Sequence, residues 1–384
     1  MSFICDDYTV ICSKANIVIN FYVYFVFWCE IESENIVLGR IEKILDWYDH
    51  HRRYLPWRSA PGVVPNPYYV WLSEIMLQQT TVITVKPYFS YFLQKWPSIG
   101  NLADAPLDDI LHAWQGLGYY ARARNLHKCA KVIKYEYFGN FPENEKDLLK
   151  LPGIGPYTAA AIAAIAFGKI ATPVDGNIER VICRLFSIKQ PIAESKVKLR
   201  ELASSMTPNF RAGDFAQSLM DIGATICIPK KPKCHLCPLT GECKANAEDI
   251  ANDIPIRAPK RKKPTRTGVV FWLYNHQGEV LLRRRPDKGL LGGMIGLPSS
   301  DWQDINQPVQ NIYRNAPVDV DWQILPGKIK HTFTHFNLIL DVAIGCCPKS
   351  ESIEGIWSSP SNFSKYALPT VIKKVVSHAL RYID

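Results

Sequence analysis

Apolar residues recur at helical spacing along most of the chain. From about Gly39 to Ile250 they predict one helix after another, with breaks at prolines and glycines. The segment that opens at Asn66 shows the pattern: Asn66 suits an N-cap, Pro67 fits the first helical position, and apolar residues follow. We therefore expect this part of the chain to be all-helical.

The pattern changes after a segment rich in proline, lysine and arginine, residues 252–266, which predicts an exposed basic linker. Beyond it, Val269–Tyr274 and Val280–Arg284 have the β-branched and apolar character of strands, with turn residues between them. Strand-like residues return in Ile329–Ile344, and a closing helix is expected from Pro369. The C-terminal part should be a smaller α/β domain.

The N-terminal region holds an apolar, aromatic run, Ile17–Cys29, of a kind found in signal sequences. It is too short to span a bilayer, Asp6 and Asp7 lie upstream of it, and no small-residue cleavage site follows. We expect residues 1–37 to be an extension of unknown role, either a buried strand or helix or upstream sequence outside the functional part. Nothing else in the chain has the length and apolarity of a transmembrane segment.

Length and charge set broad limits on the partner. The chain has 384 residues, of which 47% are apolar and 21% charged, so two or three packed units of ordinary globular composition are expected. The net charge of +9 suits a polyanionic partner, because each lysine or arginine placed on a phosphate releases a counterion. Many proteins are equally basic for other reasons, so charge alone does not identify nucleic acid.

Four of the eleven cysteines crowd into one loop with the spacing C-x6-C-x2-C-x5-C, which predicts metal ligation rather than disulfides. Four thiolates suit tetrahedral zinc or a cubane iron–sulfur cluster. Structural zinc usually takes two C-x2-C pairs from separate positions, whereas one compact loop here supplies every sulfur, and this favours a [4Fe-4S] cluster. An electron carrier is one alternative. The four candidate ligands are Cys227, Cys234, Cys237 and Cys243.

A glycine-containing hairpin, Leu151–Pro156, precedes an alanine-rich helix. Gly153 and Gly155 would let backbone N–H groups approach a phosphate at the positive end of that helix. An ordinary joint between two helices would look the same. Asp175, which lies 22 residues after Gly153, opens another helix, and an N-cap would equally explain it. The two motifs together, rather than either alone, favour a phosphate-binding hairpin followed by a functional carboxylate.

A second carboxyl group, that of Glu74, stands among apolar helical residues. Val70 and Trp71 lie one turn before it and Leu77 one turn after. Desolvation in such surroundings should raise the pKa of Glu74 and keep it protonated as a general acid. An exposed surface glutamate is the alternative.

The hairpin, the following aspartate and the four-cysteine loop together resemble the helix–hairpin–helix DNA glycosylases of the endonuclease III superfamily, in order over about two hundred residues. The segment around Glu74, with Leu55–Arg58 and Gly116–Arg122, resembles the adenine DNA glycosylase branch. Strand-cleaving members carry a lysine nucleophile just after the hairpin, where this chain has Tyr157. Without that amine no Schiff base can form, so the resemblance implies base excision without strand cleavage.

The resemblance also assigns catalytic roles by position. Glu74 would protonate the adenine ring and make it a leaving group. Asp175 would stabilise the oxocarbenium-like sugar, by charge or by transient covalent capture, as paired carboxylates do in retaining glycosidases. Tyr157 would support the same charge with its hydroxyl group.

Other positions would contact the DNA. Trp57 and Arg58 would line the pocket that receives the flipped adenine, since the base must leave the stack before it reacts. Gln79 and Tyr119 would wedge into the duplex beside the lesion, although both suit packing roles too.

The C-terminal residues, Thr267–Asp384, resemble a Nudix-type fold but lack the carboxylate cluster that holds magnesium in Nudix hydrolases, so pyrophosphate hydrolysis is not expected. Adenine glycosylases use such a domain to read 8-oxoguanine. Thr334 would bond the oxidised base, Phe333 would wedge beside it, and His331 and His335 would add polar or phosphate contacts. The family often has serine at Thr334, and the hydroxyl group is retained. A strand with alternating aromatic residues is the alternative.

The expected fold is therefore multidomain: a mainly α helix–hairpin–helix glycosylase core with a [4Fe-4S] loop and a C-terminal α/β Nudix-like domain. The expected partner is double-stranded DNA with A:8-oxoguanine or A:G mispairs, bound by a monomeric, membrane-free enzyme of the bacterial cytoplasm and nucleoid. A bifunctional pyrimidine glycosylase/lyase and a mismatch-binding protein without activity are further alternatives. The expected segments are an extension at 1–37, a cluster domain at 38–59 and 171–251, a six-helix barrel at 60–170, a linker at 252–266 and the Nudix-like domain at 267–384.

Overall fold

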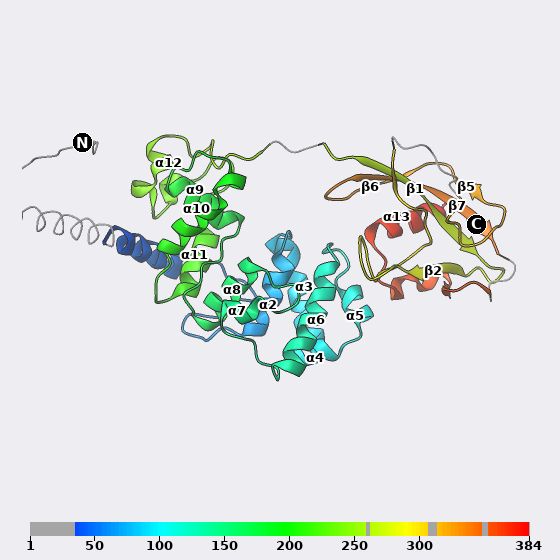
Figure 1. Ribbon diagram of the computed structural model, residues 1–384, viewed down its shortest axis with the longest axis horizontal. Helices are drawn as coiled ribbons and strands as arrows, with labels where there is room; N and C mark the ends of the chain where they lie inside the picture. Colours follow the sequence, from blue (N-terminus) through cyan, green and yellow to red (C-terminus); the bar gives the residue numbers. More distant parts are fainter. Residues whose placement is uncertain (1–34, 259–261, 306–312, 348–351, 384) are drawn as a thin grey trace, which may run out of the picture. The chain divides into compact units, whose positions relative to one another are not determined.

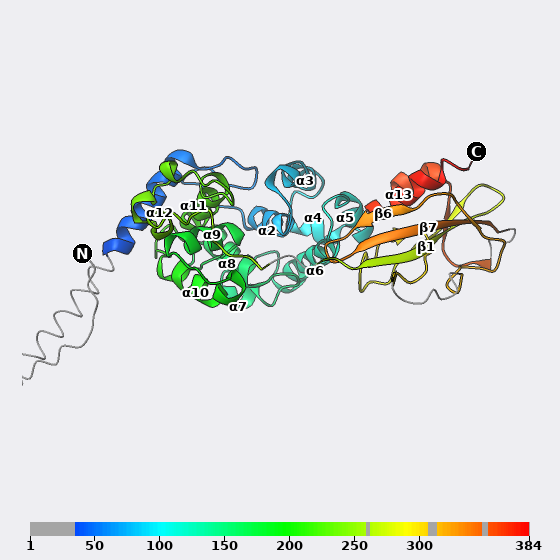
Figure 2. The same ribbon diagram turned by 90° about the horizontal axis from the view of Figure 1, so that it is seen from above.

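The computed structural model describes residues 35–258, 262–305, 313–347 and 352–383. Most of the expected N-terminal extension, including its apolar run, lies outside these residues. The chain divides into two compact units, Met1–Arg53 with Gly168–Arg257 and Tyr54–Phe167 with Ala258–Asp384 (Figures 1 and 2). In the described part of the chain, no helix has the length and apolarity needed to cross a membrane.

The first unit is helical. Residues 35–51 form a helix that packs with helices from the later segment. The loop with the four cysteines lies near the end of the unit, before its last short helix. The elements of the later segment are α9 (Gly176–Leu185), α10 (Ile192–Ser205), α11 (Ala212–Thr225), the 3-10 turns η1 (Cys234–Leu236) and η2 (Thr240–Glu242), and α12 (Lys244–Ala247).

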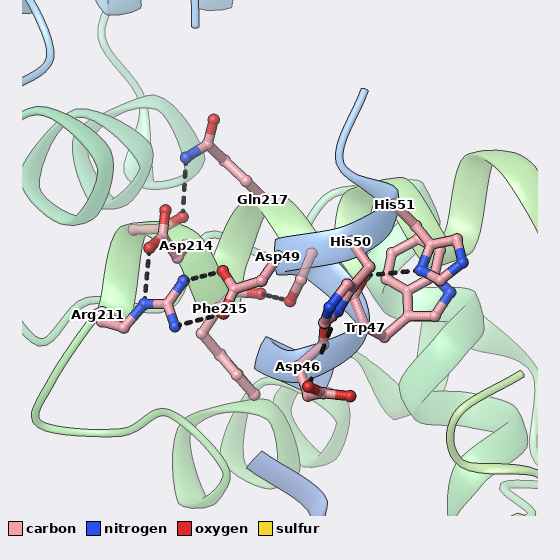
Figure 3. A network of polar contacts seen from close by, with 11 residues as sticks. Asp46, Trp47, Asp49, His50, His51, Arg211, Asp214, Phe215 and Gln217 are labelled. Atoms are coloured by element: carbon pink, nitrogen blue, oxygen red, sulfur yellow. Dashed lines mark hydrogen bonds and ion pairs between the residues drawn. The ribbon is translucent and has the colours of Figure 1, made fainter. Parts of the chain in front are cut away.

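A polar network fastens the helix of residues 35–51 to the start of α11 (Figure 3). Arg211, which precedes α11 in a left-handed conformation (φ 50°), donates from Nη1 to Asp49 at 3.0 Å and from Nε to Asp214 at 2.9 Å. The bond from Arg211 lowers the pKa of the Asp49 carboxyl group. A second bridge is more buried: Nε of Arg53 donates to the fully buried Asp221 at 2.6 Å. Segments distant in sequence are thus joined by charge-assisted bonds.

The second unit begins with helices, and α2 forms as the sequence predicts. The side chain of Asn66 caps α2 by accepting from the N–H of Tyr68 at 2.9 Å, and Pro67 occupies the first position. Helix α2 is almost wholly buried and packs against α3 and α8. The helices of this part are α2 (Pro67–Leu77), α3 (Val82–Lys95), α4 (Ile99–Asp104), α5 (Leu107–Ala113), α6 (Ala121–Glu136), α7 (Glu145–Leu148) and α8 (Pro156–Phe167).

The C-terminal part of this unit is a mixed sheet with the strand order β3-β2-β1-β7-β5, where β1 and β7 run parallel along their full length (Figure 2). Helix α13 (Thr370–Ala379) covers one face, because Val371, Ile372 and Val375 pack with the buried residues of the central strands. The strands are β1 (Thr265–Tyr274), β2 (Val280–Arg284), β3 (Ile295–Gly296), β4 (Gln303–Asp304), β5 (Gln323–Ile324), β6 (Ile329–Thr332), β7 (Asn337–Cys346) and β8 (Ile356–Ser358).

The expected hairpin is confirmed as β1 and β2, which pair antiparallel at Tyr274 and Val280. The closing helix is also confirmed, with Pro369 at the N-cap of α13. The segment 252–266 differs from an exposed linker at both ends. Ile254 is buried, and its carbonyl oxygen accepts from Nε of Arg184 at 3.0 Å. Thr265 already belongs to β1, where it pairs with Asn337 of β7.

Candidate active site and DNA-contact residues

Helices α2 and α8 bring two predicted site residues together. Glu74 is only 6% exposed, in the last turns of α2. Tyr157, in the first turn of α8, donates its hydroxyl hydrogen to Oε2 of Glu74 at 2.9 Å. The same helices are joined a turn later by Gln78, whose Nε2 donates to the hydroxyl group of Thr158 at 3.2 Å. The carboxyl group of Glu74 is therefore desolvated and held in one orientation.

The hairpin before α8 requires glycine at its turn. Gly153 has a φ of +78°, and a Cβ there would lie 2.7 Å from Cβ of Asn125 on α6. Both the conformation and the close approach exclude other residues without strain. Gly155 directly precedes α8, and its carbonyl oxygen accepts from the N–H of Ala159 at 2.9 Å. The turn thus leads straight into a helix N-terminus, which favours a bound phosphate.

In the first unit, Asp175 is the N-cap of α9. Its Oδ1 accepts from the N–H groups of Asn177 at 2.9 Å and Ile178 at 2.8 Å, and its Oδ2 accepts from the side-chain amide of Asn177 at 2.8 Å. Asp175 therefore has the N-cap role that the sequence also allows. It fixes the direction of the carboxylate, because every one of these donors is tied to the first turn of the helix.

The contacts of Asp175 continue to the cysteine loop. Arg180 of α9 donates from Nη2 to Oδ1 of Asn177 at 2.9 Å and from Nε to the carbonyl oxygen of Cys227 at 2.6 Å. A further bond from Nη2 reaches the carbonyl oxygen of Gly223 at 2.6 Å. Two side chains thus connect the candidate catalytic carboxylate with the first candidate metal ligand. Neither Asn177 nor Arg180 was predicted as a site residue, although an arginine among the buried residues of α9 is a signal for such a role.

All four candidate ligands line one cavity of the first unit, with α9, α11 and the loop as its walls. Nη1 of the buried Arg184 donates to Sγ of Cys227 at 3.3 Å, which provides positive charge beside the sulfur. Burial raises the pKa of the Cys237 thiol to about 12 and also raises that of Cys243. A bound metal must therefore displace the thiol protons. Four cysteines that line a common space beside an arginine suit a metal cluster by their chemistry, although no group of three or more His, Cys, Asp or Glu in the described residues is arranged to hold a metal ion.

The residues expected to line an adenine pocket lie at the start of the second unit. Trp57 is 6% exposed and stands edge-on to Phe89 of α3, with ring centroids 5.4 Å apart. Arg58 follows in a turn, where its N–H donates to the carbonyl oxygen of Leu55 at 3.0 Å. Trp57 is thus part of the apolar core, and its contact with a flipped base remains a prediction.

The two expected wedge residues share an unusual backbone. Gln79, in the turn after α2, has a φ of 59°, and Tyr119, in the turn before α6, has a φ of 48°. Left-handed conformations are uncommon for residues with side chains, and they concentrate at functional sites. Both side chains are exposed. Their insertion into DNA remains a prediction, which this geometry favours.

The expected lesion-reading segment begins in β6, which includes His331, and continues through the turn before β7. His331 and Phe333 are half-buried, with ring centroids 4.6 Å apart, whereas Thr334 and His335 are exposed. Residues of this segment and of the turn around Tyr119 line a pocket of about 420 Å³. Across it the hydroxyl groups of Tyr119 and Thr334 form a hydrogen bond of 2.5 Å. The structure therefore brings one wedge candidate and one lesion-reading candidate together.

The comparisons with known proteins agree with this architecture. Residues 72–208 match the family described as HhH-GPD superfamily base excision DNA repair protein, and residues 269–378 match a NUDIX domain. The chain is 35% identical over 346 residues to the adenine DNA glycosylase of Buchnera aphidicola subsp. Baizongia pistaciae, covering 89% of this chain and 97% of that protein. It is 33% identical over 394 residues to the adenine DNA glycosylase of Homo sapiens, covering 86% of this chain and 72% of that protein.

A solved structure described as a thermostable thymine-DNA glycosylase superimposes with a TM-score of 0.51 at 34% identity, covering 56% of this chain and 99% of that one. Fold, site and matches together define a base-excision DNA glycosylase of the HhH-GPD superfamily. Within it, the chain belongs to the adenine DNA glycosylase family. The expected fold class, a helical core with a C-terminal Nudix-like domain, is confirmed.

Proposed function

We propose that this enzyme removes adenine mispaired with 8-oxoguanine or guanine by hydrolysing the N-glycosidic bond, and that it leaves the DNA strand intact. The observation that carries the proposal is the bond between Tyr157 and Glu74. Strand-cleaving members of the superfamily have a lysine amine at this position. Tyr157 has a hydroxyl group there, which cannot form a Schiff base. The same hydroxyl group orients the acid required to expel a purine.

The chemical step divides between two carboxyl groups. Glu74 gives its proton to the ring of the flipped adenine, so the base leaves with the bonding electron pair as a neutral molecule. Positive charge then develops on the sugar, where Asp175 stabilises it by charge or by transient bond formation. Water adds to the sugar carbon and gives its proton to the Glu74 carboxylate, which restores the acid. The Tyr157 hydroxyl group supports the charged sugar and keeps Glu74 oriented.

The DNA-contact roles follow the same scheme. Gly153 and Gly155 present backbone N–H groups to a phosphate at the start of α8. Trp57 and Arg58 receive the flipped adenine, and Gln79 and Tyr119 fill the gap that it leaves in the stack. A monomer suffices for these contacts.

The C-terminal loop supplies the preference for the opposite base. Thr334 bonds 8-oxoguanine, Phe333 wedges beside it, and His331 and His335 add polar contacts. A pocket lined by this loop and by the turn of Tyr119 supports the assignment. The bacterial relatives support a cytoplasmic enzyme that works on nucleoid DNA.

The cofactor proposed for the cysteine loop is a [4Fe-4S] cluster. Cys227, Cys234, Cys237 and Cys243 would hold it, and Arg184 would offset the negative charge of the sulfurs. When bound, the cluster supplies structural cross-links rather than a chemical step. The loop would then present a fixed surface next to Asp175.

The proposal is tested by measuring which free base is released from a panel of duplexes with A:8-oxoguanine, A:G, A:C and T:G pairs. Mass spectrometry of the supernatant should find adenine, released fastest opposite 8-oxoguanine and next opposite guanine. Release of thymine from T:G without adenine from A:8-oxoguanine would instead favour the activity of the thymine-DNA glycosylase neighbour.

A further inference from the structure

Arg122, the second residue of α6, reaches the end of α2 through the Nη1 and Nη2 groups of its guanidinium. Nη1 donates to the carbonyl oxygens of Ile75 at 3.0 Å and Met76 at 2.9 Å, and Nη2 donates to Oγ1 of Thr80 at 3.1 Å. The last carbonyl groups of a helix have no partner within it and carry partial negative charge. Arg122 therefore caps the helix that carries Glu74.

The same guanidinium group also holds the turn before α6. Nη2 of Arg122 donates to the carbonyl oxygens of Leu117 at 3.0 Å and Gly118 at 3.3 Å. Gly118 additionally accepts from the indole N–H of Trp114 at 3.1 Å. The Arg122 guanidinium carbon lies 5.6 Å from the ring centroid of Tyr119, which is within the range of a cation–π contact. One side chain thus touches two separate turns.

Each of these two turns has a residue with a positive φ at its tip. Gln79 directly precedes Thr80, and Tyr119 directly follows Gly118. Each has a positive φ, a conformation that persists only where the surroundings impose it. Arg122 bonds a neighbour of each one, so it fixes both tips relative to one another and to α2.

We propose that Arg122 is a positioning residue for DNA opening, which holds the wedge pair Gln79 and Tyr119 in one arrangement at the end of the helix that carries Glu74. This inference rests on the proposed function of that site. Arg122 is half-buried and acts through its bonds to the two turns.

The chemistry of the contacts calls for arginine. All five acceptors are neutral oxygens in two different directions, which the planar, forked guanidinium group can reach at once. A lysine has its donors on a single nitrogen. Burial lowers the pKa of Arg122 to about 10, so the group keeps its charge at neutral pH.

The test compares Arg122→Met, Arg122→Lys and Thr80→Val on two substrates. One has adenine paired opposite 8-oxoguanine in a duplex, and the other has the same adenine in a small unpaired bubble. Lys128→Met, an exposed charge on the same helix, is the control. Circular dichroism and the visible absorbance of each protein show whether it is folded.

We expect Arg122→Met and Arg122→Lys to slow single-turnover excision from the duplex roughly tenfold or more, because the wedge residues Gln79 and Tyr119 lose the orientation needed to open the stack. Excision from the bubble should slow by less than about threefold, since its adenine is already unpaired. Thr80→Val, which removes one of the five acceptors of Arg122 together with the 3.4 Å contact from Oγ1 of Thr80 to the carbonyl oxygen of Gln78, should show the same selectivity to a smaller extent. Equal losses on both substrates would make Arg122 a general fold residue, and lysine at wild-type rates would mean that charge alone suffices. Either result overturns the proposal.

A second readout separates this inference from the proposed function. The fluorescence of 2-aminopurine placed beside the mispair should rise when wild-type enzyme opens the stack, and should rise less with Arg122→Met at saturating protein. If wild-type enzyme releases no adenine, the proposed function fails, and the fluorescence still decides whether Arg122 controls opening. An equal rise with both proteins contradicts the positioning role.

Discussion

The hydroxyl group of Tyr157 donates a hydrogen bond of 2.9 Å to Oε2 of Glu74. Because Glu74 lies near the end of α2 and Tyr157 at the beginning of α8, this contact joins the candidate acid to the helix that follows the candidate phosphate-binding hairpin. We therefore expect a phosphate bound at the hairpin to influence the orientation of the Glu74 carboxyl group through Tyr157.

Replacement of Glu74 by glutamine should remove the proton donor while keeping the shape of the side chain. General acids contribute roughly 10²- to 10⁴-fold to rate, and we expect a loss of about that size in single-turnover excision, with DNA binding retained. Glu136→Gln, an exposed glutamate at the end of α6, should leave the rate unchanged. Full activity of Glu74→Gln would remove it from the acid role.

Tyr157→Phe keeps the ring and deletes only the hydroxyl group. The orientation of Glu74 and the stabilisation of the sugar should both weaken, which we expect to cost roughly tenfold in rate, less than the loss of the acid itself. The measurement is the single-turnover rate on the A:8-oxoguanine duplex at saturating enzyme. A rate equal to wild type would mean that the hydrogen bond has no part in catalysis.

The role of Thr334 in recognising 8-oxoguanine can be tested with substitutions that nearly keep the size of its side chain. Thr334→Ser keeps the hydroxyl group and should keep the preference for 8-oxoguanine over guanine. Thr334→Val has almost the same shape without that group, and the preference should fall by roughly tenfold, the scale of one good polar contact to a base. The ratio of excision rates on the two duplexes is the readout. An unchanged ratio in Thr334→Val would reject this contact.

The cysteine loop predicts a measurable metal content. Purified protein should be yellow-brown, with iron and sulfide in near-equal amounts, and Cys237→Ser should lose both and unfold at a lower temperature, because cluster binding is coupled to folding. Cys346→Ser, outside the set of ligands, should retain the colour. Colourless protein with stoichiometric zinc would contradict the cluster.

One buried histidine should make stability depend on pH. Burial lowers the pKa of His127, and Lys131 lowers it further, although its Nε2 lies 3.3 Å from the carbonyl oxygen of Ala103. A lowered pKa means that the unfolded chain binds the proton more readily, so the stability from His127 is complete above about pH 6.5 and is lost as the pH falls below it. The decrease in melting temperature from pH 7.5 to 5 should be smaller in His127→Gln than in wild type. His276→Gln, on an exposed turn, should leave it unchanged; the opposite ordering would contradict the argument.

Local structure followed from the sequence where short-range chemistry decides it. The cap at Asn66, the hairpin of β1 and β2 and the burial of Glu74 depend on neighbours within a few residues, and all three are present. The strand-like segment Ile329–Ile344 proved to be two strands, because a turn separates β6 from β7.

Contacts across the fold could not be derived in this way. The bond from Tyr157 to Glu74 joins residues 83 positions apart, and it depends on how α8 packs on α2. The same holds for Arg122, whose acceptors come from two turns, and for the connection through Arg180 between Asp175 and Cys227. Periodicity shows that a side chain is buried, but not which oxygen it will meet.

The central claim is base removal without strand cleavage. It is tested most directly by a single-turnover reaction on an end-labelled duplex with one adenine opposite 8-oxoguanine, divided into samples with and without hot alkali. The account predicts a cleaved product only after alkali, because hydrolysis leaves an abasic site and Tyr157 cannot form a Schiff base. A cleaved product without alkali, which borohydride traps on the protein, would contradict it.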